Sequence, residues 1–391
     1  MSTHENLHFG FTKSMDVAHF AYNLAVVHNL TKTIINRHFM NMEKFEIPLP
    51  DGGIISGRFN FPAANKTPAN LPLIVCVPGG SYDAEYFDVD EDYSITSTSA
   101  WAGIPTIALT RPGYGSSTPA PMDDTDQDTT YGQFQGKYLN STVLPALWRM
   151  FSERTGTTAI VLLSHSIGAM ISTIVAGSYT GTEGYPLAGL ITSGIGAELA
   201  EGPRGGMLHV LDETTGLISF EATPKDAIML QIPMQNLTDR EMCRHTDRLN
   251  HPVPPGELHD INQTWLGYWR KYSDRVAVPV MHGLSEFDGL WNYSPKILEE
   301  YKAAFPASPK VTSEMIPLAP HCIELSLQSK AWYMKCCAFA LECVNWYELR
   351  PKSRPVSVKS GILKEGTEDT PGQSGIATLV YSTTRYEEGG L

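Results

Sequence analysis

The sequence lacks several features that direct proteins to membranes or to nucleic acids. It has no run of about 18 apolar residues, the length that a membrane-spanning helix needs, and its first residues lack the basic start and apolar core of a signal peptide. Basic residues are scarce: 29 Lys and Arg stand against 42 Asp and Glu, so the formal net charge is −13. That charge argues against nucleic acid or an anionic membrane surface as a partner. We therefore expect a cytoplasmic protein whose partner is a small-molecule substrate.

Cysteine is also scarce, with six residues in a chain of 391. Their spacing matches neither a metal site nor a disulfide framework. We expect reduced thiols in the core of an intracellular protein, and no metal site. The six are Cys76, Cys243, Cys322, Cys336, Cys337 and Cys343.

Short apolar segments alternate with helical ones along most of the chain. Hydrophobic residues make up 42% of the sequence and charged residues 18%, which is typical of a globular protein with a sizeable core. The alternation predicts an α/β fold in which helices cover both faces of a mostly parallel sheet. The predicted strands lie within residues 42–48, 54–61, 71–77, 101–110, 159–163, 187–193, 276–283 and 310–316.

Breaks in this alternation divide the chain into parts. Residues 1–38 are predicted to form an N-terminal extension that is helical in part, and residues 351–391, rich in Gly, Ser, Thr and Lys, are predicted to form a C-terminal extension. The core is predicted to comprise residues 39–195 and 276–350. Residues 196–275, with glycine- and proline-rich turns and helical pieces, interrupt the sheet pattern between its two halves. Each extension is a candidate dimer contact, so a homodimer stays an alternative to a monomer.

Ser166 lies between a predicted buried strand and a predicted helix. The segment Ser164-His165-Ser166-Ile167-Gly168 matches the pattern G-x-S-x-G except at its first position, where a small serine stands. A serine on such a tight turn projects its hydroxyl above the sheet edge, and the helix N-terminus behind it offers free N–H groups to an anion. Ser166 is therefore a candidate nucleophile. The alternative is an ordinary helix N-cap.

A nucleophilic serine needs a general base and a carboxylate that orients the base. Candidates should directly follow strands, because reacting groups gather at the carboxyl ends of parallel strands. His321 follows the last predicted strand and Asp288 follows the one before it, in the order Ser, Asp, His that this type of turn predicts. Glu286 in the same loop, and Glu198 after the sixth strand, are the alternatives for the acid.

An oxyanion that forms at Ser166 needs two backbone N–H donors. Ile167, directly after the serine, supplies one. The second is expected from the loop after the strand at 71–77, where adjacent glycines let the backbone approach closely. The N–H of Gly80 and that of Ser81 are the two candidates.

Five segments in this order resemble the serine branch of the α/β-hydrolase fold superfamily, over roughly residues 42–349, and more loosely the fungal hydrolases of secondary metabolism. The resemblance implies a carboxylic ester hydrolase that uses no cofactor. It also implies a helical cap inserted between strands six and seven, the position that residues 196–275 occupy. The segments are Pro78-Gly79-Gly80-Ser81, Arg111-Pro112-Gly113-Tyr114-Gly115, Ser164-His165-Ser166-Ile167-Gly168, Ser285-Glu286-Phe287-Asp288 and Ala319-Pro320-His321.

The methionines and aromatic residues of the predicted cap suit a bulky apolar or aromatic ligand. Trp265 and Trp269 are candidate substrate contacts there. Tyr82, after the predicted oxyanion loop, and His165, beside the serine, are two further candidates. For each of these residues, packing within the cap or the core is the alternative.

These observations predict a hydrolase that cleaves a carboxylic ester, lactone or thioester of a small molecule through an acyl-enzyme on Ser166. The same residues could serve amide hydrolysis, or a non-hydrolytic reaction as a lyase, cyclase or acyltransferase. A ligand-binding protein on an inactive hydrolase scaffold is a further alternative. The sequence leaves the substrate open, because the predicted cap would decide it.

Overall fold

The structure is a computed structural model that describes residues 42–62, 70–122, 126 and 128–350. The predicted extensions at residues 1–38 and 351–391 lie outside the described residues.

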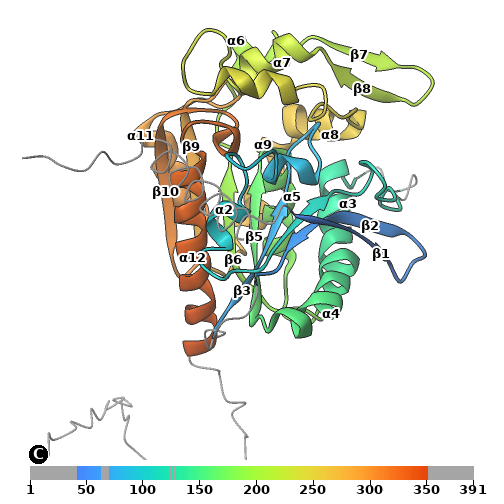
Figure 1. The fold of residues 1–391 in the computed structure, drawn as a ribbon, viewed down its shortest axis with the longest axis vertical. Coiled ribbons are helices and arrows are strands. Elements are labelled where there is room, and N and C mark those ends of the chain that lie inside the picture. The colour runs from blue at the N-terminus through green and yellow to red at the C-terminus, as the bar shows by residue number, and fades with distance from the viewer. Residues whose placement is uncertain (1–41, 63–69, 123–125, 127, 351–391) are drawn as a thin grey trace, which may run out of the picture. The chain divides into compact units, whose positions relative to one another are not determined.

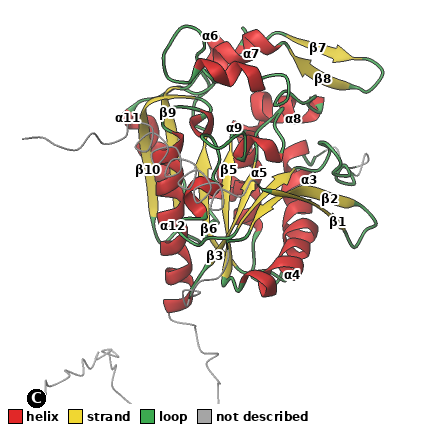
Figure 2. Cartoon of the chain, viewed as in Figure 1, coloured by secondary structure: helices red, strands yellow, loops and turns green. Residues whose placement is uncertain are grey.

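Eight strands form the central sheet (Figures 1 and 2). They are β1 (Glu43–Pro48), β2 (Ile54–Asn60), β3 (Pro72–Val77), β4 (Thr106–Thr110), β5 (Ala159–His165), β6 (Leu187–Ser193), β9 (Val280–Phe287) and β10 (Val311–Pro320). Their order is β1-β2-β4-β3-β5-β6-β9-β10, with antiparallel pairing only at β1–β2 and β2–β4. The central strands β3, β5 and β6 are buried at every residue, as expected of parallel strands covered on both faces. The predicted mostly parallel sheet is confirmed.

The predicted strands all occur in the sheet, and the largest differences in their limits concern the last two. The prediction placed the seventh strand over residues 276–283, but β9 begins at Val280 and continues to Phe287. Likewise, β10 continues to Pro320, because it pairs with β9 again after an irregularity in the register. Asp288 and His321 therefore follow directly on the last residues of two neighbouring strands.

Helices cover both faces of the sheet (Figures 1 and 2). Those of the core are α2 (Thr96–Ser99), α3 (Tyr131–Tyr138), α4 (Leu144–Thr155), α5 (Ile167–Ser178), α11 (Pro295–Ala303) and α12 (Ser329–Leu349). On one face, α12 packs against β3, β5 and β6 and against α2. On the other face, α5 packs against the same three strands and against α3. A π-helical turn at Leu139–Val143 joins α3 directly to α4.

Residues 194–279 form an insertion between β6 and β9 and lie at one edge of the sheet (Figure 1). Its elements are α6 (Glu201–Arg204), β7 (His209–Asp212), β8 (Leu217–Phe220), α7 (Ala222–Met229), η3 (Arg240–His245), α8 (Pro255–His259), η4 (Asp260–Thr264), α9 (Trp265–Tyr268) and α10 (Arg270–Ser273). The insertion contains the helical pieces expected of it and also a pair of strands that was not predicted, because β7 and β8 pair as an antiparallel hairpin. Asp212 and Gly216 shape its turn: the Asp212 carboxylate accepts from the Thr214 N–H, and Gly216 has a φ of 69°.

A buried ion pair fastens the insertion to the core. Arg111, which follows β4, donates two hydrogen bonds of 2.7 and 2.8 Å to Glu257 on α8, and both side chains are fully buried. The Tyr114 hydroxyl donates a third hydrogen bond to Glu257, at 2.7 Å. A second anchor lies on the π-helical segment η4, where the Asp260 carboxylate accepts from the N–H of Gly132 at 2.7 Å. The first anchor holds the insertion against the loop after β4, and the second holds it against the first turn of α3.

The cysteines are free thiols, and five of the six are buried. Cys243 on η3 is exposed, so the expectation that all six lie in the core is wrong for this residue. In the part of the chain that the structure describes, none of the helices combines the length and the apolar character needed to cross a membrane.

Replacing Glu257 by Gln tests the ion pair. The substitution leaves the Arg111 guanidinium buried without a counter-charge, and we expect it to lower the free energy of unfolding by about 3–5 kcal/mol. Chemical denaturation measures the change. The matched control is Glu241→Gln, which removes an ion pair with Arg244 on the exposed surface of the insertion and should cost less than about 1 kcal/mol. Equal losses of stability in the two variants would contradict the conclusion that the Arg111–Glu257 ion pair fastens the insertion to the core.

Candidate active site

Ser166 occupies a strained turn between β5 and α5. Its backbone has a φ of 53° and a ψ of −123°, a conformation that non-glycine residues rarely adopt. The turn is held from both sides, since the Ser166 N–H donates to the Ser193 carbonyl at 2.8 Å and its own carbonyl accepts from Ala169 at 2.8 Å. Ser164, which stands where the usual pattern has glycine, donates its hydroxyl to the Ile191 carbonyl at 2.9 Å. Ser164 therefore fits within the sheet, where its hydroxyl has a hydrogen-bond partner.

Two glycines allow the backbone to pack tightly around this turn. A Cβ on Gly168 would lie 2.2 Å from the Val77 carbonyl oxygen, so α5 could not approach β3 as it does with any larger residue. A Cβ on Gly79 would lie 2.9 Å from the Cβ of Ser166. The loop after β3 and the serine turn are thus brought together by the absence of these side chains.

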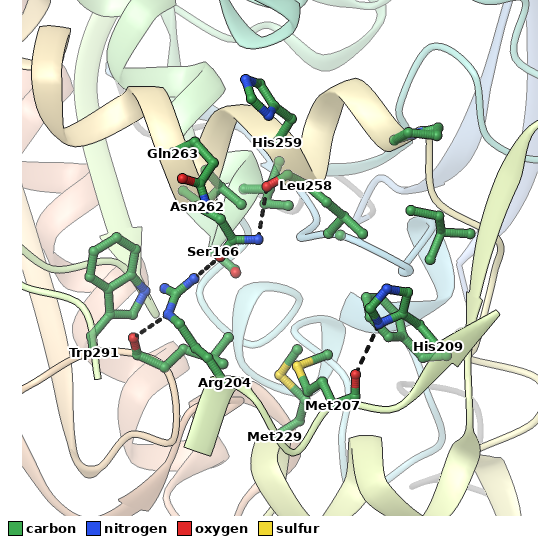
Figure 3. Close-up of a pocket in the computed structure, with 17 residues that line it drawn as sticks. Ser166, Arg204, Met207, His209, Met229, Leu258, His259, Asn262, Gln263 and Trp291 are labelled. Atoms are coloured by element: carbon green, nitrogen blue, oxygen red, sulfur yellow. Dashed lines mark hydrogen bonds between the residues drawn. The ribbon is translucent and has the colours of Figure 1, made fainter. Parts of the chain in front are cut away.

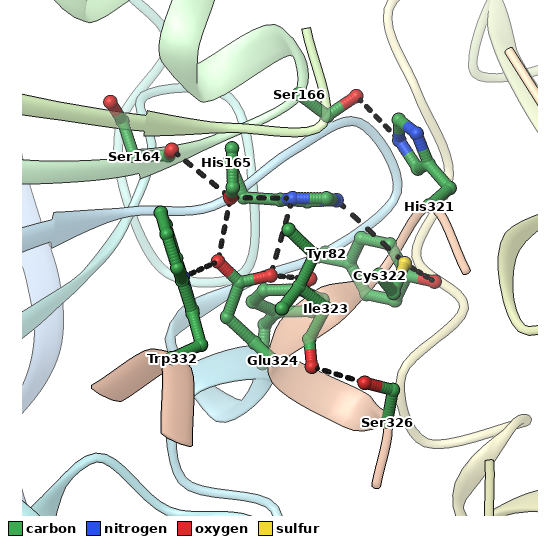
Figure 4. Close-up of polar contacts among 12 residues, drawn as sticks. Tyr82, Ser164, His165, Ser166, His321, Cys322, Ile323, Glu324, Ser326 and Trp332 are labelled. Carbon is green, nitrogen blue, oxygen red and sulfur yellow. Dashed lines mark hydrogen bonds and ion pairs between the residues drawn. The ribbon is translucent and has the colours of Figure 1, made fainter. Parts of the chain in front are cut away.

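Ser166, His321 and Asp288 form one hydrogen-bonded chain (Figure 4 shows its first contact). The Ser166 Oγ lies 3.1 Å from His321 Nε2, and His321 Nδ1 lies 2.9 Å from both carboxylate oxygens of Asp288. The side chains of His321 and Asp288 are fully buried. Asp288 is held in turn by the N–H groups of Leu290 and Trp291, at 2.8 and 3.1 Å. The carboxylate therefore faces the imidazole with its orientation set by the backbone.

The other two candidate acids lie elsewhere. Glu286 lies near the end of β9, is exposed, and accepts from the backbone N–H of Leu318 at 2.9 Å. Glu198 accepts from the Asn292 side chain at 2.7 Å. Of the three candidates, Asp288 is the one whose carboxylate contacts His321.

The loop Gly79–Ser81 follows β3 and faces the serine turn. The Ser81 N–H donates to the Tyr114 hydroxyl at 3.3 Å, so this donor is already occupied. Gly80 lines the same cavity as Ser166 and Ile167. Between the two candidates for the second donor, the geometry therefore favours Gly80.

The Arg111–Glu257 pair also supports this loop. Arg111 donates to the Gly79 carbonyl at 2.9 Å, and Glu257 holds the Tyr114 hydroxyl that accepts from Ser81. The same pair that fastens the insertion therefore fixes the backbone on both sides of Gly80.

A buried polar network lies beneath His321 (Figure 4). Its centre is Glu324, which accepts from the Ser193 hydroxyl at 2.6 Å and from the Trp332 ring N–H at 2.9 Å. Burial raises the pKa of Glu324. Burial, together with the nearby His321, lowers the pKa of His165, whose Nδ1 lies 3.1 Å from the Ser193 hydroxyl. The rings of His165 and His321 meet edge to face, with centroids 4.8 Å apart, so this network supports His321 from below.

A cavity of about 340 Å³ opens in front of Ser166, between the core and the insertion (Figure 3). Most of its lining is apolar. The lining residues are Gly80, Ser166, Ile167, Arg204, Met207, His209, Ile218, Phe220, Met229, Pro255, Leu258, His259, Ile261, Asn262, Gln263, Leu290 and Trp291.

None of the four residues predicted as substrate contacts lines this cavity. Tyr82 is buried beside Cys322, with its hydroxyl 3.5 Å from the thiol, and His165 belongs to the network beneath His321. Trp265 and Trp269 are buried in the packing of the insertion against the core. In this structure Trp265 and Trp269 therefore serve packing, the alternative that the sequence left open, and Tyr82 and His165 make buried polar contacts.

The cavity contains polar residues that the sequence did not single out. Arg204 and Asn262 line it together and are hydrogen-bonded to each other. Glu324 likewise gave no signal beyond its position three residues after His321. These residues come from segments without a recognisable motif, so only the folded chain shows their proximity. Among the described residues, no cluster of three or more His, Cys, Asp or Glu side chains is arranged to hold a metal ion.

Comparisons with known proteins agree with this fold. The chain is similar to a variant of the N-acyl homoserine lactonase AidH in complex with N-hexanoyl homoserine, with a TM-score of 0.51 and 14% identity over 77% of this chain and 97% of that one. It is also similar to DcsB in complex with a substrate analogue, with a TM-score of 0.50 and 17% identity over 78% and 99% of the two chains. At these identities the likeness shows the fold alone. No curated protein matches the sequence.

The sequence also matches the model of a protein family, described as "Alpha/beta hydrolase family", over residues 74–327. That range includes the serine turn, both loops that supply His321 and Asp288, and the whole insertion. It covers more than half of the 391 residues. The chain therefore belongs to the α/β hydrolase family.

Proposed function

We propose that the protein is a serine hydrolase that cleaves a carboxylic ester, lactone or thioester of a small molecule. The observation that carries the proposal is the hydrogen-bonded chain from Asp288 through His321 to Ser166, whose serine end faces a largely apolar cavity. A serine hydroxyl is a weak nucleophile at neutral pH, and a positioned imidazole with a carboxylate partner is the arrangement that activates it.

In the first half of the reaction, Ser166 Oγ attacks the carbonyl carbon while its proton passes to His321 Nε2. Asp288 accepts the hydrogen bond from Nδ1–H, which fixes the ring and stabilises the imidazolium. The bond from the carbonyl carbon to the leaving oxygen or sulfur then breaks, and His321 returns the proton to that atom. An acyl group remains on Ser166.

In the second half, water attacks the acyl carbon and gives a proton to His321. The bond to Ser166 Oγ breaks, the proton returns to the serine, and the carboxylic acid leaves. In both halves the developing oxyanion accepts hydrogen bonds from the N–H groups of Ile167 and Gly80. Since these donors belong to a helix N-terminus and to a loop held by Arg111, little rearrangement is needed as charge develops.

The cavity supports a substrate with a bulky apolar or aromatic part. Its volume of about 340 Å³ suits a small organic molecule, and Met207, Met229, Phe220 and Trp291 supply adaptable and flat apolar surface. Amide hydrolysis and the non-hydrolytic reactions use the same residues, and product analysis with and without an added acceptor separates them. The cytoplasmic location, the homodimer and the link to fungal secondary metabolism stay predictions.

The first test replaces the nucleophile. With p-nitrophenyl esters of graded chain length and a set of lactones, Ser166→Ala should lower kcat by at least about 10⁴-fold, because no other group can form the acyl-enzyme. The matched control is Ser172→Ala, which removes a buried hydroxyl from the same helix, α5, away from the cavity. The control should retain the wild-type rate within about twofold. Hydrolysis that survives in Ser166→Ala would contradict the proposal.

The second test identifies the acid. Asp288→Asn should lower kcat by about 10⁴-fold, since an amide no longer holds the imidazole in the required tautomer. Glu286→Gln and Glu198→Gln should each change kcat less than about threefold, because neither carboxylate contacts His321. Steady-state kinetics on one ester measure all three variants. A larger loss in Glu286→Gln than in Asp288→Asn would assign the acid to Glu286 instead.

A further inference from the structure

The cavity in front of Ser166 has a single charged side chain in its wall. Among the lining residues that the structure describes there is no Asp, Glu or Lys, and Arg204 is the only Arg. The protein as a whole carries a formal net charge of −13. The positive side chain in the cavity wall is opposite in sign to the net charge of the chain. We therefore ask which ligand this side chain could bind.

Arg204 is held in a defined position on the cavity wall (Figure 3). Its Nε donates to the Leu290 carbonyl at 3.0 Å, and its Nη1 donates to the side-chain oxygen of Asn262. The guanidinium carbon lies 5.0 Å from the centre of the Trp291 ring, within the range of a cation–π contact. These contacts fix the plane of the guanidinium group.

One nitrogen of the Arg204 guanidinium makes no hydrogen bond to the described residues. Arg204 Nη2 is buried and, among the described residues, has no hydrogen-bond partner. No carboxylate of the described residues forms an ion pair with Arg204. Asp288 acts on Arg204 electrostatically, but its oxygens are already used by His321 and by the backbone N–H groups of Leu290 and Trp291.

A partly buried guanidinium that has no ion-pair partner is unfavourable, since its desolvation is not offset by an ionic contact. Burial lowers the pKa of Arg204 to about 10, while Asp288 acts to raise it, so the group still carries its charge at neutral pH. A ligand anion beside Arg204 would supply the missing counter-charge. His259 and Gln263 also line the cavity and add polar groups.

We propose that the substrate carries a carboxylate and that Arg204 binds it while Ser166 attacks the carbonyl group elsewhere in the same molecule. A carboxylate fits better than a phosphate dianion, because a single positive charge lines a cavity that is otherwise largely apolar. The substrate class is thus an ester, lactone or thioester that also bears a free carboxyl group. This inference rests on the proposed function, which supplies the reaction at Ser166. Binding of the carboxylate can be measured separately, without any reaction.

The binding test uses ligands that lack a readily cleaved bond. The monoanilides of adipic, suberic and sebacic acid each carry one carboxylate, and the corresponding anilide primary amides are nearly isosteric and neutral. Isothermal titration should show that the wild type binds at least one acid about 10- to 100-fold more tightly than its neutral partner, as expected of a hydrogen bond to a charged group. Arg204→Gln should reduce this ratio to about one. Arg204→Lys should keep part of it, since the charge remains but the fork geometry is lost.

A kinetic test uses the p-nitrophenyl half-esters of the same three acids and their neutral primary-amide counterparts. The ratio of kcat/KM for acid over amide should fall by about 10- to 100-fold in Arg204→Gln. Arg149→Gln, on the exposed surface of α4, is the matched control and should leave the ratio unchanged. Thermal unfolding of each variant verifies that it is folded.

Three outcomes would overturn the inference. The wild type could bind the acids and the amides equally well, or Arg204→Gln could keep the preference for the acid. In the third, Arg204→Gln would lower the rates on acid and amide by the same factor, which would show that Arg204 acts only through Leu290 on the Asp288 loop. If the wild type prefers the acids in titration but cleaves none of the esters, the proposed function fails while the carboxylate site stands.

Discussion

The site depends on one backbone constraint, the turn that holds Ser166 at a φ of 53° between β5 and α5. This conformation lifts the hydroxyl off the sheet edge and directs the first N–H groups of α5 toward the cavity. It persists because the surroundings leave no room for relaxation. Gly168 lies too close to the Val77 carbonyl to carry a side chain, and Gly79 lies too close to Ser166. The strain is thus held by packing on both sides of the serine.

The parallel sheet turns this local constraint into a chemical site. Because parallel strands end at one edge, residues directly after β3, β5, β9 and β10 meet there although they are far apart in the sequence. The insertion then closes the space above them. Its Glu257 reaches back to Arg111, and Arg111 holds the Gly79 carbonyl, so one buried ion pair links the shape of the cavity to the loop that faces the developing oxyanion.

The sequence predicted the parts of the fold that local pattern determines. Buried β-branched runs and the helices between them led to the sheet, and the turn around Ser166, with the positions of Asp288 and His321 after strands, led to the residues that the structure joins by hydrogen bonds. Residues whose role depends on packing were not predictable. Trp265 and Trp269 suit a ligand pocket by type but are buried in packing, while Arg204 reaches the cavity from a segment with no motif. Contacts between residues far apart in the sequence decide which face of the insertion packs against the core. A local sequence pattern does not predict such contacts.

The most direct test of the account is to ask which residue a fluorophosphonate labels in the folded protein. Such a probe reacts with serines that a neighbouring base has activated. Peptide mapping by mass spectrometry should find one adduct per chain, on Ser166, and the labelling rate should fall sharply when His321 is replaced by Asn. No adduct, or an adduct on a different residue, would contradict the claim that His321 makes Ser166 a nucleophile.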